Sequence, residues 1–212
     1  MPEYHQIETY TTIKQDAKNY LAVYKEFLHE SGWLNSEIEE WLNRCVWSNS
    51  NDSFEYPGLS PKIEVGLLSK SINIQFMFLR WTPEIIKNLP HNCLRFDIVF
   101  ETQLIDDLSR NPEIRYTKNA QKIIWDVMNQ ASKFFPEYGI FFTDEAQDGV
   151  AWASLVDKES AKSKLWQFEC AIISNETKED FHLPNQDFFS KDTGNQLWLA
   201  RKFVWDKPLW EV

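Results

Sequence analysis

The sequence predicts an α+β fold, in which helices pack on an antiparallel sheet of about six strands. Three observations predict it. Apolar and polar residues alternate over three stretches between residues 62 and 101, as in strands with one buried face. Further apolar, strand-like stretches follow between residues 140 and 173. Apolar residues recur at helical spacing over residues 13–28 and 117–135, which predicts the covering helices.

The first 47 residues predict a helical hairpin that follows a polar lead-in. Residues 1–12 are polar and rich in Thr, so we expect a loose segment or an edge of the sheet. A helix runs from Ile13 to a stop at Gly32. A second helix begins at Asn35 and Ser36, where Ser36 and Glu39 match a capping box. The hairpin over residues 13–47 is expected to lie on the sheet.

The middle of the chain carries the alternating stretches, and their apolar residues define one buried face. A short helix is expected after Thr82 and Pro83, ending before Pro90, and another around residues 104–108. The clearest helix of the chain covers residues 117–135. The apolar positions of the three strands are Ile63, Val65, Leu67, Ile72, Ile74, Phe76, Phe78, Leu94, Phe96, Ile98 and Phe100.

Three more strands are expected in the second half, at residues 140–143, 150–156 and 165–173. Asp148 and Gly149 between the first two are typical of a hairpin turn, and both flanking strands are apolar enough to be central. Residues 175–196 are polar and irregular, which indicates a loop. Residues 196–205 fit a helix or a strand, and we favour the helix.

The predicted element order is α-α-β-β-β-α-β-β-β with a C-terminal element, in a single domain over residues 1–212. Its parts are the hairpin at about 13–47, the sheet and helix region at about 62–174, and a C-terminal segment at about 175–212. This length suits one domain.

The amino-acid composition limits which classes of partner and which cellular compartment we expect. The chain has 22 Lys and Arg against 32 Asp and Glu, giving a net charge of −10, which repels nucleic acid and favours a basic protein partner or self-association. No apolar run approaches the roughly 20 residues of a membrane span. The N-terminus lacks an export signal, and Cys45, Cys93 and Cys170 form no CxxC pair, so we expect a cytoplasmic protein.

Motifs for catalysis, metals and cofactors are missing from the sequence. The four His have no metal-binding spacing, and the six Gly form no phosphate-binding loop, so no cofactor or metal is predicted. His91 and Cys93 share one short loop and would make a nucleophile and base only if folding brought them together. We interpret Cys93 as a buried residue at the entry of a strand.

Carboxylates offer the other candidate chemistry. Asp97 and Glu101 lie on the same side of their strand as Arg95, and Glu64 lies on a neighbouring strand. A magnesium nuclease needs a Lys beside such carboxylates, and none follows Glu101, so we interpret these residues as charges on the solvent face. The acidic cluster of Asp144, Glu145 and Asp148 is interpreted as turn chemistry.

Aromatic residues are abundant, with ten Trp, fifteen Phe and seven Tyr. Trp is enriched at interface hot spots, so Trp198, Trp205 and Trp210 near the C-terminus are the predicted partner-binding residues. The leading hypothesis is therefore a non-catalytic protein-binding domain of the chaperone, adaptor or antitoxin kind. The alternatives are a hydrolase or nuclease whose carboxylate site forms only on folding, and a pocket for a small apolar ligand.

Overall fold

The structure, a computed structural model, has one large antiparallel sheet and confirms the α+β fold. It describes residues 4–14, 18–48, 53–55, 57–67, 70–86, 88–106, 116–157, 162–181, 185–205 and 207–212. The sheet has eight strands, against about six predicted, in the order β4-β5-β6-β1-β7-β8-β10-β9. Its strands are β1 Tyr4–Thr12, β4 Ile63–Leu67, β5 Lys70–Trp81, β6 Cys93–Glu101, β7 Gly139–Asp144, β8 Cys170–Ser174, β9 Phe188–Asp192 and β10 Gln196–Arg201.

The three strands predicted between residues 62 and 101 are confirmed, and they form one side of the sheet, with β4 at its edge. β4 pairs with β5 and β5 pairs with β6, and Phe78 lies opposite Phe96. Alternation turns one row of apolar side chains to the same face of the sheet. Phe76, Phe78, Phe96 and Ile98 are all buried together in the larger apolar core.

Five α-helices and four 3-10 helices accompany the sheet in the described residues, together with a small hairpin. The α-helices are α1 Lys18–Glu30, α2 Ser36–Asn43, α3 Thr102–Ile105, α4 Lys118–Phe134 and α5 Val150–Val156. The 3-10 helices are η1 Glu145–Gln147, η2 Lys162–Trp166, η3 Lys178–Phe181 and η4 Leu209–Glu211. The hairpin pairs β2 Val46–Ser48 with β3 Ser53–Glu55, where the end of the helical hairpin was predicted.

The helix boundaries follow local sequence signals. The Thr117 hydroxyl accepts a hydrogen bond from the Ala120 amide and caps α4, the clearest predicted helix. Gly32 ends the α1 turn with a positive φ of 72°, as its position in the sequence predicted. The cap of α2 is the side chain of Asn35, which accepts from the Ile38 amide, and not the predicted Ser36.

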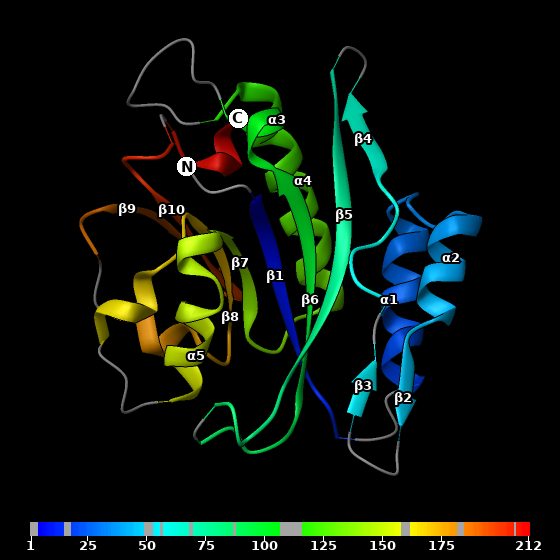
Figure 1. The fold of residues 1–212 in the computed structure, drawn as a ribbon. Coiled ribbons are helices and arrows are strands. Elements are labelled where there is room, and N and C mark those ends of the chain that lie inside the picture. Colours follow the sequence, from blue (N-terminus) through cyan, green and yellow to red (C-terminus); the bar gives the residue numbers. More distant parts are fainter. Residues whose placement is uncertain are drawn as a thin grey trace.

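The helices lie on both faces of the sheet and bury an apolar core on each. Figure 1 shows α1, α2 and α4 on one face and α5 on the other. The larger core includes Phe96 and Trp41, and the smaller one, beneath α5, includes Phe141 and Trp152. None of the described helices has both the length and the apolar character needed to cross a membrane.

The largest error of the sequence prediction concerns β1. Residues 4–12 are not a lead-in or an edge, because they form a central strand between β6 and β7. Their polar side chains His5, Gln6, Glu8 and Thr9 are buried. Buried polar groups need partners, and neighbouring strands and turns provide them here, so the polarity of this segment does not indicate exposure.

The second half of the chain departs from the prediction in four further places. Residues 150–156 form helix α5 and not a strand, because a short apolar run has no period that separates the two. Residues 196–201 form strand β10, where we favoured a helix. The polar segment 175–196 contains strand β9 and η3, and β8 is shorter than the predicted strand at 165–173.

Of the two predicted short helices, the first is not an α-helix and the second is present in part. Described residues after Thr82 make turns, in which the Ile85 and Ile86 amides both donate to the Thr82 carbonyl, and not an α-helix. The next short helix exists as α3, from Thr102 to Ile105, while residues 107 and 108 of the prediction lie outside the described residues.

Candidate functional site

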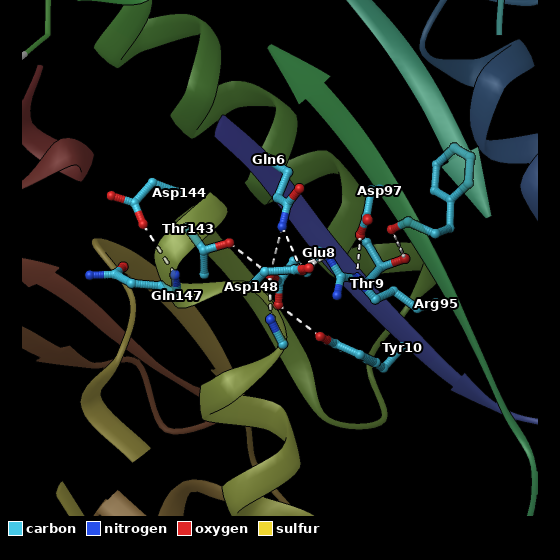
Figure 2. Close-up of polar contacts among 12 residues, drawn as sticks. Gln6, Glu8, Thr9, Tyr10, Arg95, Asp97, Thr143, Asp144, Gln147 and Asp148 are labelled. Carbon is cyan, nitrogen blue, oxygen red and sulfur yellow. Dashed lines mark hydrogen bonds and ion pairs between the residues drawn. The ribbon is translucent and has the colours of Figure 1, made fainter. Parts of the chain in front are cut away.

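A largely buried network of charged and polar groups joins the centre of the sheet to the start of α5. It consists of Gln6, Glu8 and Tyr10 from β1, Arg95 and Asp97 from β6, Thr143 from β7, and Asp148 and Gly149 from the turn before α5. Figure 2 shows Glu8 near its centre, with Gln6, Tyr10 and Thr143 pointing toward it and Asp97 beside Arg95. We call it the Glu8 network.

The carboxylate of Glu8 accepts hydrogen bonds on both oxygens. Oε1 accepts from the Thr143 hydroxyl at 2.7 Å and from the Gly149 amide at 3.0 Å. Oε2 accepts from the Tyr10 hydroxyl at 2.7 Å. The side-chain amide of Gln6 adds a bond of 3.2 Å to Oε1. These donors replace the water that Glu8 loses on burial, so a charged residue is tolerated in a central strand.

Arg95 is the one cation of the Glu8 network. Its Nε donates to Asp97 Oδ1 at 2.7 Å, and its Nη2 lies 3.4 Å from Glu8 Oε1 and also pairs with Asp148. The side chains of Arg95 and Asp97 have no exposed surface, while that of Asp148 is 46% exposed. The prediction that Arg95 and Asp97 lie on the solvent face is therefore wrong.

Gly149 allows the turn to approach the sheet. Its φ is 67°, in the left-handed region that side chains disfavour. A Cβ atom here would lie 3.2 Å from Arg95 Nη1 and 3.6 Å from the Tyr10 hydroxyl. The glycine predicted for a hairpin is thus needed, but it starts helix α5 and fixes it to β1 through Glu8.

Within the Glu8 network, Asp97 has a raised pKa. Burial raises the pKa of Asp97 to about 7, although the charge and hydrogen bond of Arg95 act to lower it; Glu8 and Asp148 add to the rise. Three carboxylates therefore lie around one guanidinium, and the raised pKa of Asp97 lets it keep a proton up to near neutral pH. A catalytic acid must also reach its substrate. The exposed fraction of Asp97 is zero, so the geometry supports a structural charge network and not an exposed catalytic dyad.

The raised pKa of Asp97 predicts how stability depends on pH. An unfolded Asp titrates near pH 4, so between about pH 4 and 7 the folded chain holds a proton that the unfolded chain has lost. The contribution of Asp97 to the free energy of unfolding should therefore fall as the pH rises through this window, and it should not change further above it. Asp97→Asn cannot lose a proton, so its stability relative to the parent should rise over the window by up to about 4 kcal/mol.

Urea unfolding at several pH values measures this difference. The exposed Asp187→Asn substitution is the control, and its curve should run parallel to that of the parent chain. Parallel curves for Asp97→Asn as well would contradict the pKa assigned to Asp97.

A second cluster brings together His5, Asp144 and Glu169, whose donor atoms lie within 4.8 Å of one another. His5 Nδ1 lies 2.9 Å from the Thr102 hydroxyl, and the Tyr116 hydroxyl donates to Glu169. Asp144 Oδ1 accepts from two amides of η1. All three residues make additional contacts with neighbouring groups, so we interpret the cluster as packing and assign no metal to it.

The other residues considered for catalysis do not form a site. His91 is exposed, whereas Cys93 is fully buried, and no hydrogen bond joins these two described residues. Burial, with the charge of Glu137, raises the pKa of the Cys93 thiol, which makes it a poor nucleophile. Glu101 pairs with Lys62 near the surface, away from the Glu8 network, and Glu64 is exposed as predicted.

The three predicted partner-binding tryptophans lie at two different depths. Trp205 is fully buried, and its indole N–H donates to the Glu169 carbonyl at 2.8 Å. Trp198 and Trp210 are partly buried and pack with Trp125 of α4, at ring distances of 4.9 and 5.8 Å. Trp205 thus has no surface for a partner in this conformation, while Trp198 and Trp210 keep some.

Two of the cavities among the described residues lie near opposite ends of the sheet, each with a volume of about 270 Å³. The first lies by β9 and β10 and is lined by aromatic residues such as Trp166 and Phe188, together with Lys178 and Asp192. The second lies between the end of α1, strand β4 and helix α4. Both volumes lie just below the range of roughly 300–1,000 Å³ typical of small-molecule sites, and the predicted small-ligand pocket stays an untested alternative.

The cavity beside β4, which we call the β4 groove, combines apolar walls with acidic groups. Trp33, Val65, Ile123 and Val127 contribute apolar surface, Glu30 and Asp126 are exposed carboxylates, and the other lining residues are Ser31, Gly66 and Gln130. Among the residues that the structure describes, no Lys, Arg or His lines it. Of these two cavities, the β4 groove is the better match for a positively charged ligand, because its charged lining residues are carboxylates.

Sequence reasoning missed both sites because their residues are far apart in the chain. Glu8 lies in a segment that has no strong strand signal, and the β4 groove joins α1, β4 and α4. One signal was available for the Glu8 network: Glu8, Tyr10, Arg95 and Asp97 are spaced two apart within each strand, which places each pair on one face.

Comparisons with known proteins do not extend this account. No family model matches the chain, and neither the curated proteins nor the solved structures contain a significant match.

Proposed function

We propose that this protein is a non-catalytic binding domain that takes up a basic segment of another protein in the β4 groove. The observation that carries the proposal is the composition of the groove: its described lining has apolar walls and two exposed carboxylates and includes no Lys, Arg or His, while His29 Nδ1 lies 3.7 Å from Glu30 Oε1. The net charge of −10 acts in the same direction over the whole surface.

The walls of the groove suit the side chains of Lys and Arg. Their aliphatic stems cover apolar surface while the charged ends stay near water or a carboxylate. The partly buried Trp33 offers an indole on which a cation can also stack. A Lys or Arg lying against Trp33 and Val127 would place its charge close to Glu30 or Asp126, both of which line the same groove.

The surface around Trp198 fits a basic partner less well. The ammonium group of Lys191 lies over the Trp198 ring at 5.0 Å and already occupies that cation site. Trp198, Trp125 and Trp210 also pack on one another, which uses much of their apolar area. We therefore place the partner in the β4 groove and keep the tryptophan surface as the competing location.

Charge reversal in the groove tests the proposal. The probe is a fluorescent octapeptide of alternating Lys and Val, and its dissociation constant is measured by anisotropy at about 0.02 M and 0.15 M salt. Glu30→Lys combined with Asp126→Lys should weaken binding at least about tenfold, because two attractive charges become repulsive ones. Binding to the parent chain should weaken as salt rises.

Glu176→Lys combined with Asp187→Lys is the matched control, since both residues are exposed near the opposite end of the sheet and the change in net charge is the same. This control should keep the affinity of the parent within about threefold at 0.15 M salt, where charges more than about 8 Å away are screened. Equal losses in the two double variants, or no binding of the peptide to the parent, would refute the proposal.

A further inference from the structure

We infer that the partner segment binds as an added β-strand on the outer edge of β4, with its basic side chains turned into the β4 groove. The inference rests on the proposed function and specifies its partner: an extended segment in which Lys or Arg occupies every second position. Its evidence is the state of the β4 edge and the place of the groove beside it.

The outer edge of β4 is open to pairing. β4 is the first strand of the sheet order, so only β5 pairs with it. Within the described residues, positions 63–67 make no main-chain hydrogen bond other than those with β5. An edge strand with unpaired amides and carbonyls is a template for another chain.

Side chains do little to guard this edge. Over residues 63–66 of β4, whose side chains the structure describes, Gly66 has no side chain and is exposed, and the exposed Glu64 turns away from the core. The opposite edge of the sheet differs, because β9 ends in the exposed Ser190, Lys191 and Asp192. Charged residues, and Lys above all, are a usual protection of edge strands. Of the two edges, β4 is the less protected.

The groove lies where the side chains of an added strand would point. Val65 and Gly66 of β4 line it together with residues of α1 and α4, so it is on the helical face of the sheet edge. Alternate residues of a strand turn to the same face. An added strand would therefore send every second side chain toward Trp33, Glu30 and Asp126, and main-chain hydrogen bonds would hold the segment in place.

This mode of binding determines which segments fit. A helix presents residues of one face three and four apart and hides its amides, so it cannot pair with β4. An extended segment with Lys or Arg at alternate positions satisfies both the edge and the carboxylates of the groove. The octapeptide of alternating Lys and Val has a cation at every second position. The corresponding octapeptide of alternating Glu and Val has carboxylates there, so it does not fit the acidic groove.

Backbone methylation of the peptide tests strand addition. Two further Lys and Val octapeptides carry N-methyl groups on three alternate amides, one peptide on the odd and the other on the even positions. Amides of alternate residues point to the same edge of a strand, so one of these peptides loses the donors that face β4. Its affinity should fall at least about tenfold below that of the unmethylated peptide, while charge and side chains are unchanged.

The outcomes separate this inference from the proposed function. If both methylated peptides bind the parent like the unmethylated one, and the double variant of Glu30 and Asp126 still loses binding, strand addition is wrong while the groove remains a binding site. If none of the peptides binds the parent, the proposed function fails and the inference fails with it. A loss confined to one methylated peptide, together with the effect of charge reversal, supports both.

Discussion

Arg95→Met is expected to lower the free energy of unfolding by about 3–5 kcal/mol at neutral pH. Arg95 is the cation that forms ion pairs with the carboxylates of Glu8, Asp97 and Asp148, and its side chain has no exposed surface. Its removal leaves carboxylates buried without a counter-charge, which costs more than the loss of the ion pairs themselves. Equilibrium unfolding in urea measures the change.

Neutralising the partners should restore part of this loss. Arg95→Met combined with Glu8→Gln and Asp97→Asn removes the buried charges together, so the triple variant should be more stable than Arg95→Met alone. The loss in Arg95→Met should also shrink at acidic pH, where the carboxylates take up protons. A loss below about 1 kcal/mol at neutral pH would show that Arg95 is not the buried counter-charge described here.

Phe96→Ala is expected to cost about 3–5 kcal/mol, as is typical when a buried Phe is truncated. Phe96 is fully buried in the middle strand β6, and its ring lies 5.0 Å from those of Tyr24 and Phe78 and 5.4 Å from that of Phe76. The cavity left by the ring would lie between α1 and the sheet, so few side chains could move in to fill it.

Phe203→Ala is the control for this variant, because Phe203 is 75% exposed and its truncation removes little buried area. Its stability should stay within about 0.5 kcal/mol of the parent. Chemical unfolding of both variants gives the comparison, and a cost below about 1 kcal/mol for Phe96→Ala would mean that β6 turns its other face to the helices.

Periodicity predicted those parts of the fold whose two faces differ. The alternation in β4, β5 and β6 and the apolar stripe of α4 each reflect one buried face, and the structure confirms these elements. The alternation also led to one error. Arg95 and Asp97 lie on the second face of β6, which polarity alone assigned to solvent, but α5 and its preceding turn help to bury that face.

Strand β1 could not be predicted in the same way, because its buried residues are polar. Glu8 is tolerated there only since Thr143, Gly149 and Tyr10 donate to it, and two of these donors lie more than 130 residues away. A pattern of side chains within one segment carries no information on such partners. The Glu8 network and the central position of β1 therefore appear only in the folded structure.

Other errors arose where local patterns fit two structures equally. Residues 150–156 are apolar except for Ser154, and residues 196–205 match both periods, so the surrounding sheet decided between helix and strand. The β4 groove could not be predicted either, because Glu30, Val65 and Asp126 come to line one cavity only when α1, β4 and α4 pack together. The net charge alone led to the hypothesis of a basic partner. A binding place for that partner could be proposed only from the folded structure.

The most direct test of this account is hydrogen exchange of the backbone amides, with and without the alternating Lys and Val octapeptide. An added strand should slow the exchange of the outward-facing amides among residues 63–67, which have no described main-chain partner beyond β5. The same amides should show no change in the double variant of Glu30 and Asp126. Unchanged exchange at residues 63–67, with slowing instead around Trp198 and Trp210, would place the partner on the tryptophan surface and contradict the account.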